Sequence, residues 1–119
     1  MVEKYINEAF ASLGDVIPKD WEKIKLHAII NLDYYEIFFY VKCNGEYIQC
    51  YDLEDKYQIT EDEIDDVFET WYKISIAEKK EEEWQDYTVS IESNGKFAVD
   101  YNYDNDFDLF IWKDKYLKD

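Results

Sequence analysis

The sequence has few of the residues that interrupt regular structure or carry common catalytic chemistry. Its 119 residues include three glycines, one proline, two cysteines and one histidine. So little glycine and proline predicts regular helices and strands with few sharp turns. His27 is the only histidine and its strand context is unremarkable, so no serine–histidine–aspartate or cysteine–histidine arrangement can be assigned, and we expect His27 on a solvated strand face. Because CxxC, HExxH and glycine-rich phosphate-loop motifs are also missing, we predict no enzyme activity, no catalytic residue and no cofactor.

Long apolar runs are missing as well. No stretch approaches the roughly 20 apolar residues of a membrane-spanning helix. No signal peptide is visible either, since no N-terminal segment combines a basic start, an apolar run and a small-residue cleavage site. Cys43 and Cys50 flank a predicted hairpin turn without lying opposite each other, which favours reduced, buried thiols. We therefore predict a cytoplasmic protein with no membrane partner.

Positive charge is scarce, whereas acids and aromatic residues are abundant. Thirteen lysines and arginines stand against 29 aspartates and glutamates, a net charge of −16. Such a field repels nucleic acid and attracts basic proteins, unless the charge serves solubility alone. Twelve tyrosines, seven phenylalanines and four tryptophans exclude a disordered acidic tail. We predict one folded domain over residues 1–119.

Hydrophobic periodicity predicts the elements of the first half. Helical spacing over residues 3–13 predicts a helix, and alternation over 22–32 predicts a half-buried strand. A second strand is expected at 35–42, with aromatic residues on both of its faces. Asn44-Gly45 predicts a two-residue hairpin loop that leads to a third strand.

Pairing arguments set the register of both hairpins. The first loop pairs Val41 with Ile48 and Phe39 with Cys50, which keeps apolar side chains on one face. In the second hairpin, residues 86–103, a two-residue loop would mix the faces. A three-residue loop, Ser93-Asn94-Gly95, instead predicts these pairs: Ile91 with Phe97, Val89 with Val99, and Tyr87 with Tyr101.

Residues 58–83 contain the main helix, and residues 107–117 a short one whose aromatic residues should cover the sheet. Thr60 and Glu63 form a capping box at the start of the main helix. Its inward stripe is expected to be Ile64, Val67, Phe68, Trp71, Ile74 and Ser75. The order α-β-β-β-α-β-β-α predicts an α+β fold, a mostly antiparallel sheet of about five strands with helices packed on it.

The segment VDYNYDNDFD, residues 99–108, resembles the start of a calcium loop. However, the sixth position from Asp100 is Asn105 where glycine is needed, and the twelfth is Ile111 where a bidentate glutamate is needed. A strand explains the alternation better: Val99, Tyr101 and Tyr103 face the core, and Asp100, Asn102 and Asp104 share the other face. We predict no metal site.

Two acidic surfaces are the candidate partner-binding sites. Aromatic residues, notably Tyr103 and Phe107, accompany the first, and acids with interleaved aromatic residues are typical of protein interfaces. The first surface comprises Asp100, Asp104, Asp106 and Asp108, and the second, on the outer face of the main helix, comprises Asp62, Asp65, Asp66 and Glu69.

Several motifs, spread nearly end to end, resemble one family. They are IPKDW at 17–21, EIFFY at 36–40, Trp84, TVSIESNGKFAVDYNYD at 88–104, and IWKDKYL at 111–117. In these motifs and their joint spacing the chain resembles the YezG-like (EsaG-type) bacterial antitoxins.

The resemblance implies a cytosolic, non-enzymatic immunity protein that binds and neutralises a cognate nuclease toxin. A nuclease must attract a polyanion and tends to be basic, so a partner with a charge of −16 is steered to it. We expect the acidic surface to cover the nucleic-acid-binding face of the toxin; a second mode is that it binds beside the active site or distorts it. The alternative is a DNA mimic, or another acidic protein, that sequesters a basic partner.

Overall fold

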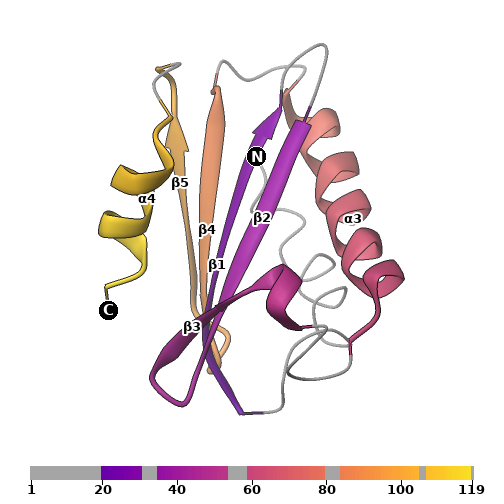
Figure 1. Cartoon of the computed structure of the whole chain (residues 1–119). Coiled ribbons are helices and arrows are strands. Elements are labelled where there is room, and N and C mark those ends of the chain that lie inside the picture. Colours follow the sequence, from indigo (N-terminus) through magenta and orange to yellow (C-terminus); the bar gives the residue numbers. More distant parts are fainter. Residues whose placement is uncertain (1–19, 31–34, 54–58, 80–83, 105–106, 119) are drawn as a thin grey trace.

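The computed structural model describes residues 20–30, 35–53, 59–79, 84–104 and 107–118 of the chain (Figure 1). The helix expected at residues 3–13 lies outside them. The elements in chain order are β1 (Trp21–Ile30), β2 (Tyr35–Cys43), β3 (Glu46–Gln49), the 3-10 turn η2 (Cys50–Asp52), α3 (Glu61–Lys79), β4 (Asp86–Glu92), β5 (Phe97–Asn102) and α4 (Leu109–Tyr116).

The five strands form one antiparallel sheet in the order β3-β2-β1-β4-β5, with β1 at its centre (Figure 1). The hairpins β2–β3 and β4–β5 lie on either side of β1, and α3 connects the two halves of the sheet. The predicted α+β class, with helices packed on a mostly antiparallel sheet of about five strands, is confirmed.

Local turn chemistry decides the hairpin registers. Asn44 and Gly45 adopt positive φ angles of 54° and 78°, and Val41 pairs with Ile48 as predicted. The expected pair Phe39–Cys50 is wrong, because the ladder ends at Tyr40–Gln49 and Cys50 begins η2. In the second hairpin Gly95 has a φ of 93°, and the three predicted pairs are confirmed: Ile91–Phe97, Val89–Val99 and Tyr87–Tyr101.

Helix α3 covers one face of the sheet. Its capping box is present: the Glu63 N–H donates to Thr60 Oγ1 (3.2 Å), and the Thr60 N–H donates to Glu63 Oε1 (3.3 Å). The predicted inward stripe is confirmed, since Ile64, Val67, Trp71, Ile74 and Ser75 are buried and Phe68 is half-buried. These side chains and the apolar face of β1, β2 and β4 form the main core.

Helix α4 covers the opposite face, as Figure 1 shows. Trp112 is buried, and its Nε1–H donates to Thr88 Oγ1 on β4 (2.9 Å). The prediction of a solvated His27 is wrong: its ring is fully buried, stacks on Phe107 (centroids 4.2 Å apart) and lies 3.2 Å from Asp86 Oδ1. Strand alternation shows only which residues share a face, and it does not show that α4 covers this one.

Tyr103 also departs from its predicted place, because its side chain is 56% exposed instead of lying in the core. Strand β5 ends at Asn102, so Tyr103 has no partner strand in the described sheet to bring it inward. The side chain of Asn102 turns the chain here: its Oδ1 accepts from the Asp104 N–H (3.2 Å), and its Nδ2–H donates to the Asp104 carbonyl (3.0 Å).

Candidate protein-binding surface

The start of α4 exposes three consecutive apolar side chains. The Asp108 carboxylate caps the helix by accepting from the N–H groups of Phe110 (2.9 Å) and Ile111 (3.2 Å). Because Trp112 points into the sheet, Phe110 and Ile111 point outward, with exposed fractions of 81% and 67%, and Leu109 at the start of the helix is 38% exposed. We call these three residues the α4 ridge. The expectation that the aromatic residues of this segment cover the sheet is confirmed for Trp112 and wrong for Phe110.

A groove of about 310 Å³ lies beside the ridge, between α4 and strands β4 and β5. Ile111 belongs both to the ridge and to the lining of this groove. The lining also includes the carboxylates Asp86, Asp100 and Asp108, the ring of Phe107, and the ammonium group of Lys115. We call this space the α4 groove, and its lining carries more negative than positive charge.

Hydrogen bonds hold two of the groove carboxylates in place. Asp86 lies against the His27 ring, and its Oδ2 accepts from Asn102 Nδ2–H (3.1 Å). Asp100 Oδ2 accepts from the Tyr116 hydroxyl (2.9 Å). Burial, and then the hydrogen bond and negative charge of Asp100, raise the pKa of Tyr116, so this hydroxyl stays a donor at neutral pH.

The structure brings part of the first predicted acidic surface together. Asp100 and Asp108 both line the α4 groove, and Asp104 is exposed at the nearby end of β5. Asp106 lies outside the described residues. Asp86 is absent from the predicted surface, because nothing in the sequence shows that Asp86 and His27 meet on the face that α4 covers.

The second predicted surface is a separate one. Its four acids are exposed on the outer side of α3: Asp62, Asp65, Asp66 and Glu69. Glu69 pairs with Lys73 (3.0 Å). Since α3 and α4 lie on opposite faces of the sheet, the structure does not join the two acidic surfaces (Figure 1). We call the four α3 residues the α3 acidic face.

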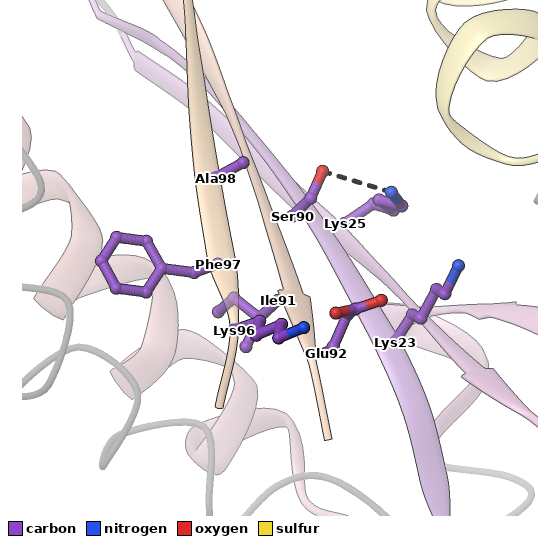
Figure 2. A pocket seen from close by; sticks show the side chains of 8 residues that line it. All are labelled: Lys23, Lys25, Ser90, Ile91, Glu92, Lys96, Phe97 and Ala98. Carbon is purple, nitrogen blue, oxygen red and sulfur yellow. Dashed lines mark hydrogen bonds between the residues drawn. The ribbon is translucent and has the colours of Figure 1, made fainter. Parts of the chain in front are cut away.

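A third surface feature has the opposite charge. A hollow of about 180 Å³ at the hairpin end of β4 and β5 is lined by Lys23, Lys25, Lys96 and the single acid Glu92 (Figure 2). Lys25 is buried, and its Nζ donates to Ser90 Oγ (3.2 Å). Three ammonium groups around one carboxylate do not suit a basic partner, so this hollow is not part of the acidic surfaces.

Two further features bear on the class of site. Within the described ranges, no three or more His, Cys, Asp and Glu side chains are grouped so that they could hold a metal ion. In the same part of the chain, no helix has both the length and the apolar character needed to cross a membrane.

Comparison with known proteins identifies the family. The family of YezG-like immunity proteins matches residues 2–117. The chain is 28% identical over 101 residues to the immunity protein YezG of Bacillus spizizenii, an alignment that covers 78% of this chain and 63% of the relative. It is also 28% identical over 102 residues to the immunity protein YezG of Bacillus subtilis, covering 78% of this chain and 67% of the relative. The chain therefore spans about two thirds or less of the length of these relatives, and it belongs to the YezG-like immunity protein family.

Proposed function

We propose that this protein is a cytoplasmic, non-enzymatic immunity protein that binds and neutralises a cognate nuclease toxin. The observation that carries the proposal is the family match over residues 2–117, together with two relatives that are named immunity proteins. An immunity protein acts by binding, and a binding role needs no catalytic group.

The charge of the chain supports a nuclease as the target. A nuclease domain binds a polyanion, so its substrate face is positively charged. A net charge of −16 speeds the encounter with such a face and aligns the two proteins before contact. Bound there, the immunity protein excludes nucleic acid by occupying the same surface.

The two acidic surfaces have different parts in this proposal. The face around Asp100, Asp104 and Asp108 combines exposed apolar side chains, which suit an interface centre, with carboxylates, which suit its polar rim. The α3 acidic face lies on the other side of the sheet and adds to the long-range field. Because the α3 acidic face lies on the opposite side of the sheet from α4, steering without contact is the role we assign to it.

Affinity capture followed by an inhibition assay tests the proposal. The tagged chain is used to capture proteins from lysate of its own species at moderate salt, and the partners are identified by mass spectrometry. We expect one stoichiometric partner with a nuclease domain, whose purified form loses its nucleic-acid cleavage activity when one equivalent of the chain is added. If the purified nuclease keeps its full activity at excess chain, the proposal is wrong.

The DNA-mimic alternative predicts a different result in the same experiment. A mimic binds several nucleic-acid-binding proteins through charge, so its partners are a mixture that salt removes. An immunity protein with an apolar interface centre retains its one partner in salt, because apolar contacts are not screened.

A further inference from the structure

We propose that the α4 ridge is the anchor of the toxin interface, and that the α4 groove beside it receives a lysine or arginine side chain of the toxin. This inference rests on the proposed function, because it names the contact surface and the chemistry of the partner. It goes beyond the acidic residues, whose charge alone does not distinguish one basic protein from another.

The exposure of the ridge is the first argument. Phe110 is 81% exposed and Ile111 67% exposed, while Trp112 next to them is buried and holds α4 on the sheet. The fold thus does not need Phe110 or Ile111 for its own core. Large apolar side chains that sit side by side on a rigid helix and are rimmed by polar groups mark protein-binding sites.

The charge around the ridge indicates what covers it. Asp108 directly precedes the ridge in the chain, and Asp86, Asp100 and Asp108 line the groove. Acids outnumber cations in this region: Lys113, Lys115 and Lys118 stand against Asp86, Asp100, Asp108 and Asp114, and Lys118 pairs with Asp114 (2.6 Å). A partner with an apolar patch surrounded by lysine and arginine side chains is therefore complementary, whereas a second copy of this acidic chain is not.

The groove geometry explains why a long cationic side chain fits. The groove has apolar walls in Phe107 and Ile111, which suit the methylene stem of a lysine or arginine. Carboxylates of Asp100 and Asp108 lie in its lining and can accept from an ammonium or guanidinium group. Asp86 and Asp100 are already held by internal hydrogen bonds, so little ordering is needed when the partner binds.

The test measures binding of the captured, purified nuclease domain to four proteins: the wild type, the double variant Phe110→Ser/Ile111→Ser, Asp108→Ser and the control Tyr51→Ser. Tyr51 is a matched control because it is an exposed aromatic residue (55%) on η2, away from α4. Asp108→Ser removes the charge and keeps a residue that caps helices. Circular dichroism and thermal unfolding confirm that each variant is folded.

We expect the double variant to raise Kd at least about tenfold, because interface hot spots typically contribute more than 1 kcal/mol each. Asp108→Ser is expected to lower the association rate and its salt dependence, and Tyr51→Ser to change neither. Lysozyme, a basic protein without nuclease activity, serves as a charge-only partner, and its weak binding should be unaffected by the double variant.

Each other outcome overturns the inference. If the double variant binds and inhibits the nuclease like the wild type, the ridge is not the anchor, and the proposed function still stands. If the wild type dimerises in sedimentation experiments and the double variant is monomeric, a second copy covers the ridge. If the wild type neither binds nor inhibits the nuclease, the proposed function and this inference fall together.

Discussion

Asp108 belongs both to the fold and to the proposed binding surface. Its carboxylate satisfies two N–H groups of the first turn of α4, while it also lines the α4 groove. Asp100 likewise accepts a hydrogen bond within the fold, from the Tyr116 hydroxyl, and also lines the α4 groove. Substituting such a residue by alanine therefore changes the helix and the surface together. A second variant, which removes the charge but keeps the cap, is needed to distinguish the two effects.

We expect Asp108→Ala to lower the free energy of unfolding by about 1 kcal/mol, because α4 loses its N-cap. Asp108→Ser should lose only a few tenths of a kcal/mol, since serine also accepts from the N-terminal N–H groups. Urea denaturation measures both. The control Asp114→Ala removes an exposed acid from the same helix, and a loss from Asp114→Ala as large as that from Asp108→Ala would show that capping is not the cause.

The buried hydroxyl of Tyr87 leads us to expect that the protein loses stability at alkaline pH. The Tyr87 hydroxyl is buried, and it donates to Ser75 Oγ (2.7 Å), since the Ser75 hydroxyl itself donates to the Trp71 carbonyl (2.7 Å). Burial raises the pKa of Tyr87 well above that of an exposed tyrosine. The folded state therefore favours the neutral phenol, and this contribution is complete below about pH 10 and is lost as pH rises toward the folded pKa.

The measurement is the free energy of unfolding of wild type and Tyr87→Phe from pH 7 to 11. Tyr87→Phe should be less stable by about 1 kcal/mol at pH 7, and the gap should narrow above about pH 10. The control is Tyr103→Phe at an exposed tyrosine, and its free energy of unfolding should change with pH as that of the wild type does. A gap that stays constant to pH 11 would contradict the assignment.

At the scale of elements, α4 is the part of the fold that converts one sheet face from solvated to buried. His27, Thr88 and Asp86 lie on this face and are all buried in the presence of α4. Trp112 supplies the contacts that hold the helix, with its ring near those of Phe38 (5.0 Å) and Tyr40 (5.9 Å). Trp112 is the fully packed side chain of α4, and the Tyr116 hydroxyl adds a hydrogen bond to Asp100 on β5 (2.9 Å).

We expect Trp112→Ala to lower the free energy of unfolding by about 3–5 kcal/mol and to loosen α4. The chain has a single histidine, so its chemical modification reports on this face alone. Diethyl pyrocarbonate should modify His27 slowly in the wild type and rapidly in Trp112→Ala. Phe110→Ala is the matched control from the same helix, and rapid modification of His27 in that variant would mean that α4 does not shield the ring as described.

At the scale of the whole molecule, the charge of −16 acts on stability as well as on binding. Acids cover both sides of the sheet, on α3 and around α4, so their mutual repulsion opposes the compact state. In the proposed complex, separation of the two acidic surfaces by the sheet would let one of them contact the partner while the other still adds to the attractive field.

Salt should therefore stabilise the free protein. The Debye length falls from about 30 Å at 0.01 M to about 3 Å at 1 M ionic strength, which screens repulsion between surface acids. We expect the Tm at pH 7 to rise between 10 mM and 500 mM NaCl. The rise should be about 4 °C for each kcal/mol by which screening increases the free energy of unfolding. The rise should be smaller at pH 5, where fewer carboxylates are ionised, and a Tm that falls with salt would show that ion pairs outweigh repulsion.

Features governed by neighbouring residues could be predicted from the sequence. The two hairpin registers follow from turn residues and alternation, and the start and inward stripe of α3 follow from Thr60, Glu63 and helical periodicity. The family could also be recognised from motifs and their spacing. These depend on contacts within one element or between adjacent strands, which the chain order largely determines.

Only the tertiary structure decided what lies against the second face of the sheet. Burial of His27, exposure of Phe110, the α4 groove and the separation of the two acidic surfaces all depend on where α3 and α4 pack. Local periodicity cannot specify this, because a helix with several apolar residues can bury more than one face and the sheet determines which one. In this protein the sheet buries Trp112, and the same rotation of α4 turns Phe110 and Ile111 toward solvent.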